Sequence, residues 1–425
     1  MLNELYERLS LWKDFELPNI IERELRIPET ADIIAVYGPR RAGKTYFMFQ
    51  MMKNLIENGI PKENILYVNF DDIIFRKYDV KKIFNAYFEL FNPKGEIYLF
   101  LDEIQNLTDW PIWLRTLYDE GYRIFITGSS SKLMIQEIAK ELRGRYTSRL
   151  ILPFSFREFL KLNKFEFIDT YVKSGEIKNF LREYLTFGGF PEVISIKNRL
   201  DKREKLLSIY ETTFYRDFVE RYKVREIEIA KVLLEFILSN TSKAFSITKI
   251  HNTFKTMGIN VSKRTLWKYY NEMIESLLFF EVNIFTYSKR KEILFPRKVY
   301  SVDTGISNLA KTQIESILAE NIIFLELLRR NNNIYYYLTK SRKEIDFYIP
   351  NRSMLIEVSL EYDDEHIKKL KEAMNELKIN EAYIITWDHE DEKEFNYSGK
   401  IYRIKFIPLW KWLLKNYNYN ELSII

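Results

Sequence analysis

Short hydrophobic runs alternate with segments of helical periodicity between residues 33 and about 155. The segment 45–59, which follows the first run, has the length and apolar spacing of a helix. This alternation predicts a parallel sheet covered by helices. The predicted strands lie in IIAVYG (33–38), NILYVNF (64–70), EIYLFLDE (96–103), YRIFITGS (122–129) and RLILPF (149–154).

The hydrophobic period changes further along the chain. A mostly helical pattern over 156–225 is interrupted by a turn at FGGFPEV (187–193), and helices then precede two β-rich runs around the basic tip SKRKE (288–292). We expect those two runs to form a hairpin. The final part reads as a second small α/β unit with strands in IYYYLT, EIDFYI, MLIEVSL and AYIITW. The prediction is therefore four modules, 1–155, 156–225, 226–304 and 305–425.

Composition narrows the classes of function. The chain has 425 residues, too many for one hydrophobic core, and its 46% hydrophobic and 29% charged residues are ordinary for a soluble globular protein. No apolar run is long enough for a membrane helix, and the N-terminus carries acids where a signal peptide is apolar, so we predict a cytoplasmic protein. The absence of cysteine excludes disulfides and zinc–thiolate sites. A net charge of +5 means that any nucleic-acid binding must come from local patches.

The sequence GPRRAGKT (38–45) fits the phosphate-binding pattern G-x-x-x-x-G-K-[ST] and lies between a predicted strand and a predicted helix. Its glycines let backbone N–H groups face inward, and the helix N-terminus adds positive potential for a phosphate. Lys44 is expected to reach the β and γ phosphates of ATP, and Thr45 to coordinate Mg²⁺. The predicted nucleotide-binding residues are Gly38, Pro39, Arg40, Arg41, Ala42, Gly43, Lys44, Thr45 and Tyr46.

Two acids follow the apolar run IYLFL (97–101). An aspartate at the carboxyl end of a strand beside the loop strand is where a Mg²⁺ ligand is needed, so Asp102 takes that role and Glu103 is expected to polarise the attacking water. Strand capping alone is the alternative for both acids. Hydrolysis is therefore predicted as well as binding.

Two further residues are candidates for responding to the γ-phosphate. Ser129, with Thr127 close behind, follows the next strand, although a plain turn and a helix N-cap explain the same residues. Arg145 in LRGRYTSR is the candidate for an arginine presented to a neighbouring subunit, which would require a homo-oligomer. A solvated or ion-paired arginine is the alternative.

The ordered set GPRRAGKT, LFLDEIQ, ITGSSS, LRGRY with PFSFREF, and GGFPEV resembles archaeal and bacterial AAA-type ATPases that carry a C-terminal domain of unknown function. The similarity spans nearly the whole chain. It implies an α/β fold with a P-loop ATPase core and parallel sheet, a helical lid, a winged helix and a C-terminal restriction-endonuclease-like α/β domain. The GGFP and PFSF motifs themselves suggest no chemistry.

Residues 245–282 read as a helix, a turn at MGINVS, and a second helix with Ser262 as its N-cap. This is a helix-turn-helix layout, in which the second helix enters the major groove, and the resemblance supports a winged helix here. Purely structural or protein-contact use of the same unit is the alternative. The predicted contacts to double-stranded DNA are Lys263, Arg264 and Lys268 at the start of the second helix, and Lys289 and Arg290 at the hairpin tip.

Three acids of the tail, Glu326, Asp346 and Glu357, resemble the metal-binding acids of the restriction-endonuclease-like fold, whose signature is an acid followed by E-x-K. Converging carboxylates would hold Mg²⁺ near a scissile phosphate. Ser359 stands at the lysine position, and nothing local favours Lys368 or Lys369 as a substitute. A degenerate fold used for dimerisation or nucleic-acid grip is the preferred alternative to a nuclease.

The predicted function is hydrolysis of MgATP coupled to DNA binding or to remodelling of a DNA-bound partner. A nucleotide-operated switch that regulates a protein partner and an ATP-driven nuclease are the alternatives.

Overall fold

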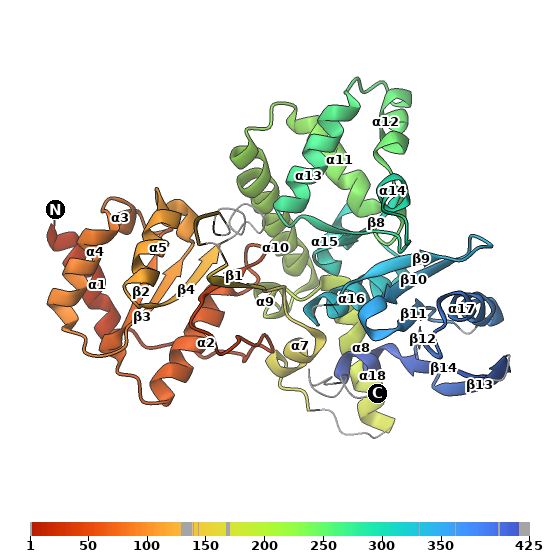
Figure 1. Cartoon of the computed structure of the whole chain (residues 1–425), viewed down its shortest axis with the longest axis horizontal. Coiled ribbons are helices and arrows are strands. Elements are labelled where there is room, and N and C mark those ends of the chain that lie inside the picture. Colours follow the sequence, from red (N-terminus) through yellow and green to blue (C-terminus); the bar gives the residue numbers. More distant parts are fainter. Residues whose placement is uncertain are drawn as a thin grey trace. The chain divides into compact units, whose positions relative to one another are not determined.

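The fold was analysed in a computed structural model that describes residues 2–128, 138, 140–142, 144–166, 171–330, 332–361, 363–397 and 400–415. The chain forms two compact units (Figure 1). The first comprises Met1–Leu152 with Glu275–Leu277, and the second comprises Pro153–Ile274 with Leu278–Ile425. Apart from Glu275–Leu277, the modules predicted over 156–425 lie in one compact unit, and their separate identities remain predictions.

The first unit contains one five-stranded sheet of order β2-β3-β4-β1-β5. Every neighbouring pair is parallel, which confirms the predicted parallel α/β architecture. β5 begins earlier than the predicted run because its pairing with β1 starts where Tyr146 lies opposite Ile33. The strands are β1 (Ile33–Tyr37), β2 (Ile65–Asn69), β3 (Tyr98–Asp102), β4 (Arg123–Gly128) and β5 (Tyr146–Leu150).

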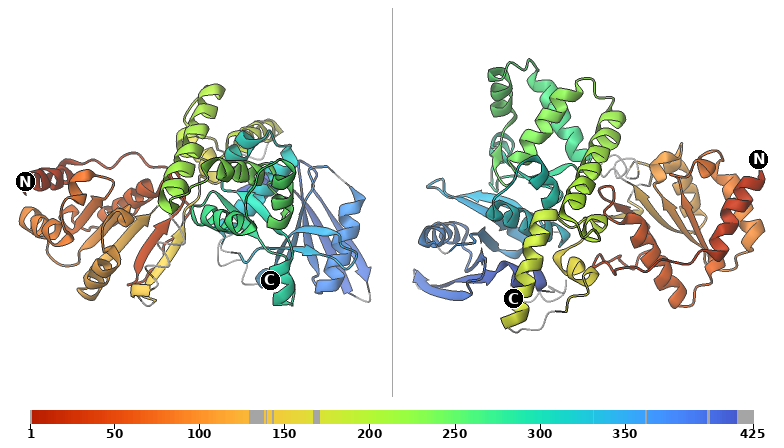
Figure 2. Two further views of the ribbon diagram at one scale, coloured as in Figure 1. Left: turned by 90° about the horizontal axis from the view of Figure 1, so that it is seen from above. Right: turned by 180° about the vertical axis from the view of Figure 1, so that it is seen from behind.

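Helices cover both faces of this sheet. Ile33 and Ala35 of β1 pack in the larger core cluster, whereas Ile34 and Val36 pack in a second cluster, so successive residues are buried on opposite sides. Figure 2 shows the strands side by side as one sheet. The helical elements are α1 (Leu2–Asp14), α2 (Lys44–Glu57), η1 (Lys62–Asn64), α3 (Ile73–Arg76), α4 (Val80–Phe91), η2 (Ile104–Asn106) and α5 (Trp110–Asp119).

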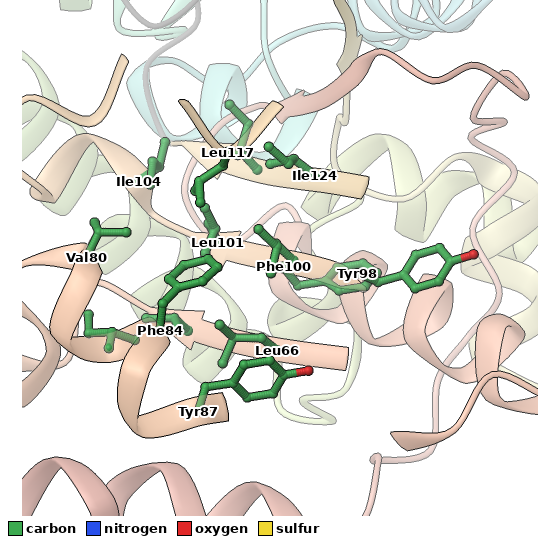
Figure 3. Close-up of a cluster of buried hydrophobic side chains, with 14 of the residues drawn as sticks. Leu66, Val80, Phe84, Tyr87, Tyr98, Phe100, Leu101, Ile104, Leu117 and Ile124 are labelled. Atoms are coloured by element: carbon green, nitrogen blue, oxygen red, sulfur yellow. The ribbon is translucent and has the colours of Figure 1, made fainter. Parts of the chain in front are cut away.

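The larger core cluster fixes the strands that carry the predicted catalytic acids. Phe84 and Tyr87 of α4 point onto Leu66 of β2 and the β3 residues around Leu101 (Figure 3). The Phe100 ring stacks on Phe125 of β4 with 4.6 Å between the ring centroids. Because β3 is buried along its whole length, its carboxyl end is held in a fixed place at the edge of the sheet.

The second unit begins with a helical segment, as predicted for 156–225. It contains α7 (Phe156–Leu162), α8 (Tyr171–Phe187), α9 (Pro191–Ile194), α10 (Arg199–Thr212) and the π-helix η3 (Thr213–Glu220). Ser155 caps α7, because its side chain accepts a hydrogen bond from the Glu158 N–H while the Glu158 carboxylate accepts one from the Ser155 N–H.

The GGFP turn is a junction between distant segments of this unit. At Gly188 φ is +76°, and an added Cβ would lie 1.8 Å from the Asp303 carboxylate, so no other residue fits. Asp303 accepts hydrogen bonds from the N–H groups of Gly189 (2.7 Å) and Gly305 (2.8 Å). The Phe154 N–H of the PFSF motif donates to the Gly189 carbonyl at 2.7 Å. Both motifs without evident chemistry therefore have a structural purpose.

The middle of the unit has the predicted pair of helices separated by a turn, followed by two antiparallel strands. A three-stranded antiparallel sheet has the order β6-β8-β7. The elements are α11 (Ile227–Ser239), β6 (Ala244–Phe245), α12 (Ile247–Thr256), α13 (Lys263–Glu275), β7 (Phe279–Val282), α14 (Lys289–Leu294), β8 (Arg297–Ser301) and α15 (Thr304–Ala310).

The predicted hairpin is correct in its strand pairing and wrong at its tip. β7 and β8 pair antiparallel, but the SKRKE sequence between them begins the helix α14. Ser288 is the N-cap of this helix and accepts a hydrogen bond from the Lys291 N–H. Lys289 and Arg290 thus stand on the first turn of a helix rather than in a tight turn.

The tail of the chain forms a six-stranded mixed sheet of order β13-β14-β12-β11-β10-β9. β11, β12 and β14 are parallel, and the other pairs are antiparallel. The four predicted strands are confirmed, whereas β13 and β14 were not predicted from the sequence. The elements are α16 (Glu315–Arg329), β9 (Tyr335–Leu338), β10 (Glu344–Ile349), η4 (Pro350–Arg352), β11 (Met354–Val358), α17 (Asp364–Leu377), β12 (Glu381–Thr386), β13 (Asp391–Tyr397), β14 (Lys400–Pro408) and α18 (Leu409–Leu414).

Candidate functional site

The predicted phosphate loop connects β1 to α2. Gly38 has no room for a side chain, because an added Cβ would lie 2.1 Å from the Ile151 carbonyl oxygen. Gly43 directly precedes α2 with φ at +95°, a value that favours glycine. Arg41 also has a positive φ of 61°. The loop therefore makes a tight turn whose last residue leads into the helix N-terminus, as the sequence pattern predicts.

Lys44 lies inside this turn and is only 5% exposed. Its Nζ donates hydrogen bonds to the carbonyl oxygens of Gly38 and Pro39, both at 3.2 Å. The Nζ also lies 3.5 Å from Glu103 Oε1. All three contacts are long for bonds to an ammonium group. The ammonium is thus held near the loop by partners that a phosphate oxygen of higher charge can displace.

Asp102, at the end of β3, is completely buried and faces α2. The Thr45 hydroxyl donates to Asp102 Oδ2 at 2.7 Å, and the Tyr67 hydroxyl donates to the same oxygen at 3.2 Å. The Thr127 hydroxyl donates to the other oxygen, Oδ1. Burial and the charge of Glu103 raise the pKa of Asp102 above its usual range. A buried carboxylate beside a threonine hydroxyl is a donor set that suits Mg²⁺.

Glu103 follows immediately and has a positive φ of 50°. Its N–H donates to Thr127 Oγ1 at 3.0 Å, and its Oε2 accepts a hydrogen bond from Gln105 Nε2 at 2.5 Å. Burial acts to raise the pKa of Glu103, but the Lys44 ammonium and the Gln105 amide hold it below the ordinary value. The side chain is therefore an anion beside Lys44.

The remaining predictions in the first unit have mixed outcomes. Ser129 lies outside the described residues. Arg145 is half exposed, forms an ion pair with Asp119 at 2.7 Å and lies over the Tyr118 ring. Two predicted nucleotide-binding residues remain to be placed. The Tyr46 side chain is 53% exposed. The positive charge of Arg40 helps to lower the pKa of Glu103.

Two residues of this site were not predicted. Tyr67 is in β2 and reaches Asp102 because Asn69 and Asp102 end neighbouring strands in register. Arg23 precedes the first strand, in a segment without periodicity. It is buried, and its guanidinium donates to the carbonyl oxygens of Ala42 (2.8 Å) and Leu152 (2.6 Å). No local sequence signal identifies Arg23, because the carbonyl oxygens of Ala42 and Leu152 are backbone atoms that any residue at those positions would supply.

The cations predicted to contact DNA are exposed in the second unit. Ser262 caps α13 as predicted, accepting a hydrogen bond from the Thr265 N–H at 3.0 Å. The apolar face of α13, which includes Leu266, Tyr270 and Met273, is buried. Trp267 is 40% exposed, and the Arg297 guanidinium lies 5.2 Å from its ring centroid. The exposed cations are Lys263, Arg264 and Lys268 on α13, and Lys289 and Arg290 on α14.

The structure does not group the three acids predicted for the tail. Glu326 is buried and paired with three arginines, at 2.8 Å from Arg157, 2.8 Å from Arg330 and 3.6 Å from Arg329. Burial opposes ionisation, but the charges of Arg330, Arg157 and Arg329 lower the pKa of Glu326 to about 2. Glu326 is therefore the centre of a structural ion-pair cluster.

Asp346 and Glu357 have other partners. Asp346 Oδ1 lies 3.1 Å from Lys298 Nζ, and its Oδ2 accepts a hydrogen bond from the Val358 N–H at 2.9 Å. Glu357 Oε1 is bound by Lys369 and lies 3.1 Å from His366 Nδ1. Burial and the charge of Asp346 raise the pKa of Glu357 to about 7. Within the described part of the chain, no group of three or more acidic, histidine or cysteine side chains is arranged to hold a metal ion.

Comparisons with known proteins identify an AAA domain that covers most of the first unit. Residues 30–160 match the AAA domain family, and residues 178–316 and 316–412 match two domains of unknown function, DUF8612 and DUF4143. These matches confirm the predicted AAA-type core and the C-terminal domain of unknown function. In the part of the chain that the structure describes, no helix has both the length and the apolar character needed to cross a membrane.

Two relatives that match most of the chain carry names that assign no function. The chain is 35% identical over 413 residues to Uncharacterized protein MJ1544 of Methanocaldococcus jannaschii, covering 93% of this chain and 91% of the relative. It is 28% identical over 399 residues to an uncharacterized protein of Haemophilus influenzae, covering 92% and 97%. AMPPCP-bound DnaA from Aquifex aeolicus aligns with 64% of this chain and 86% of its own at 15% identity, but the TM-score of 0.26 is too low to support an inference.

Proposed function

The chain belongs to the family of Uncharacterized protein MJ1544, and we propose that it is an ATPase that binds MgATP at the carboxyl ends of β1 and β3 and hydrolyses it. The observation that carries this proposal is the meeting of four side chains from two sequence motifs. Thr45 contacts Asp102 at 2.7 Å while Lys44 lies 3.5 Å from Glu103. Phosphoryl transfer needs an ammonium, a metal-binding pair and a residue that orients water, and these four supply all of them.

The roles follow from the contacts. Thr45 and Asp102 would hold Mg²⁺, which when bound neutralises charge on the β and γ phosphates. Lys44 leaves its long contacts with the loop carbonyls and binds phosphate oxygens. Glu103 then loses the cation that lowers its pKa, and its carboxylate accepts a hydrogen bond from the attacking water. Thr127 holds both acids in place, because its hydroxyl contacts Asp102 and the Glu103 N–H.

Two further roles belong to this proposal. Ser129 follows β4 and would respond to the γ-phosphate. Arg145 is exposed on the first unit and would act on the nucleotide of a neighbouring copy, so a homo-oligomer is part of the proposal. The ion pair between Arg145 and Asp119 is exposed to solvent, so breaking it would cost little free energy.

The test of hydrolysis is the Glu103→Gln variant. We expect ATP binding, measured by calorimetry with MgATP, to be retained, and kcat to fall by about 100-fold or more because the water is no longer oriented. Glu120→Gln is the matched control, since Glu120 is an exposed acid of the same unit. Normal turnover by Glu103→Gln would show that this residue does not orient the water.

Binding of double-stranded DNA by the second unit is the second part of the proposal. The order α11, β6, α12, α13, β7, α14, β8 with its three-stranded antiparallel sheet is that expected of a winged helix in which α14 replaces the tip of the hairpin and α13 enters the major groove. The exposed cations of α13 and α14 support this proposal because they gather at the two elements that would face the duplex. The ATPase core would use its cycle to change the affinity of this unit for DNA or a DNA-bound partner.

A charge-neutralising variant tests DNA binding. The variant replaces Lys263, Arg264, Lys289 and Arg290 with alanine, and the control replaces four half-exposed cations of the first unit, Lys53, Lys77, Lys82 and Arg115. For the first variant we expect a weaker affinity for duplex and a salt dependence whose slope falls by up to about 3 to 4. An affinity equal to that of the control would refute DNA contact by these elements. ATP turnover unchanged by duplex would favour instead a switch acting on a protein partner.

A further inference from the structure

A buried lysine occupies the centre of a carboxylate cluster in the second unit. Lys298, on β8, has a side chain only 1% exposed. Its Nζ lies 2.7 Å from Glu320 Oε1, 2.9 Å from Glu344 Oε1 and 3.1 Å from Asp346 Oδ1. The three acids come from two elements, α16 and β10, so the lysine joins three parts of the fold.

The ammonium is saturated by these contacts. A lysine ammonium has three N–H donors and no acceptor, and three carboxylate oxygens lie within hydrogen-bonding distance of it. The acids are held by further donors: the Tyr300 hydroxyl donates to Glu320 Oε1 at 2.8 Å, and the Val358 N–H donates to Asp346 Oδ2. A buried ammonium is tolerated only when it is paired in this way.

We propose that the three carboxylates form a site for a divalent metal ion and that the ammonium group of Lys298 occupies this site in its place. Converging carboxylate oxygens are the ligands that Mg²⁺ and Mn²⁺ prefer. Burial and the charge of Asp346 raise the pKa of Glu320 to about 8, so at neutral pH the formal charge of the three acids is nearer −2 than −3 against the single charge of Lys298.

A neighbouring acid supports the same conclusion. Glu357 Oε2 is buried and has no hydrogen-bond partner, while Oε1 of the same carboxylate is bound by Lys369. Val358, the next residue, binds Asp346 through its N–H, so Glu357 lies beside the cluster. Lys369 thus forms an ion pair with Glu357, just as Lys298 forms one with Asp346. The two acids with the metal-binding pattern are therefore each paired with an ammonium group.

The experiment compares Mn²⁺ binding by nucleotide-free full-length chains. The variants are Lys298→Met, the double variant Lys298→Met with Asp346→Asn, and Lys53→Met as an exposed-lysine control. Mn²⁺ is titrated while thermal unfolding is followed, and bound Mn²⁺ is counted by electron paramagnetic resonance. Because every chain retains the ATP site, weak Mn²⁺ binding there is common to all and cancels in the comparison.

We expect saturating Mn²⁺ to raise the Tm of Lys298→Met by at least about 5 °C and to add one bound ion. The double variant and the Lys53→Met control should show neither effect. A folded Lys298→Met chain that gains no Mn²⁺ site would overturn the proposal.

A second measurement keeps the proposal testable if Lys298→Met does not fold. Wild type and Asp346→Asn are compared in Mn²⁺, and equal ion counts are expected because Lys298 already fills the site. An ion bound by wild type and lost in Asp346→Asn overturns the proposal, as does Mn²⁺-dependent cleavage of DNA by wild type that Asp346→Asn abolishes. None of these measurements uses ATP, so their outcome is independent of the proposed ATPase activity.

Discussion

Replacement of Arg23 tests whether the phosphate loop is held in its binding conformation from outside the sequence motif. The guanidinium donates to the carbonyl oxygens of Ala42 and Leu152 at 2.8 and 2.6 Å, and the Arg23 N–H donates to Gln50 Oε1 at 2.8 Å. The buried arginine thus ties the loop residue before Gly43 to the segment after β5 and to α2. In the variant Arg23→Met the apolar stem is retained and the guanidinium is lost.

The expected magnitude follows from the two hydrogen bonds. Each hydrogen bond to a charged group contributes about 1.5 to 3 kcal/mol, and both carbonyl oxygens are left without this donor, so the variant should lose about 3 kcal/mol or more of stability. If about half of this loss falls on a loop whose open and closed forms are nearly equal in free energy, the fraction of chains able to bind ATP falls by up to about tenfold. The Kd for MgATP should rise by the same factor.

Calorimetry of MgATP binding and steady-state ATPase kinetics measure this effect. We expect the Kd and KM for ATP to rise by up to about tenfold while kcat falls less, because the guanidinium bonds described above hold the phosphate loop and the segment after β5. Arg26→Met is the matched control, since Arg26 lies on the same segment with an exposed side chain. A lower Tm with unchanged ATP affinity would refute the positioning role, and an equal loss in Arg26→Met would show that the effect is not specific to Arg23.

Three further predictions concern single contacts. The folded-state pKa of Glu326 is about 2, below the ordinary 4.5, so its carboxylate contributes stability above pH 4.5 that is lost as the pH falls toward 2. In a denaturant titration at pH 7, Glu326→Gln should lower the free energy of unfolding by about 3 kcal/mol. The difference from wild type should shrink as the pH is lowered. Gly188→Ala should unfold at a lower temperature than Gly258→Ala, since both glycines have nearly the same φ but only Gly188 faces a carboxylate, that of Asp303. Thr127→Val should lower kcat about tenfold with little change in KM, because it removes one hydrogen bond to each catalytic acid.

The proposed ATP site could be assigned from the sequence because its residues are local in sequence. The loop, the helix that follows it and the acids at the end of β3 each occupy a few consecutive residues, and strand alternation places them at the same edge of a parallel sheet. Tyr67 and Arg23 were missed for a different reason. Each acts on an atom supplied by another segment, and neither residue stands in a pattern of its own.

Two acids of α16, Glu320 and Glu326, have surroundings that the sequence alone does not reveal. A rotation of about 100° per residue places their side chains on different faces of the helix. Which face of α16 packs against the sheet depends on the residues from other segments that contact the helix. Arg157, which binds Glu326, is 169 positions away, and Lys298, which contacts Glu320, is 48 positions from Asp346. The glycines of GGFP were unexplained for the same reason, since Asp303 lies 114 positions after Gly189.

Two buried lysines of this chain meet carboxylates in ways that imply opposite functions. Lys44 has two carbonyl contacts at 3.2 Å and a carboxylate at 3.5 Å, whereas Lys298 has three carboxylates between 2.7 and 3.1 Å. A triphosphate brings more charge than the partners of Lys44, so that ammonium is exchangeable and Glu103 is released when ATP binds. No incoming ligand improves on the contacts of Lys298, so that ammonium is fixed. Ligand-dependent change is therefore expected at the ATP site, while the cluster around Lys298 stays closed throughout the cycle.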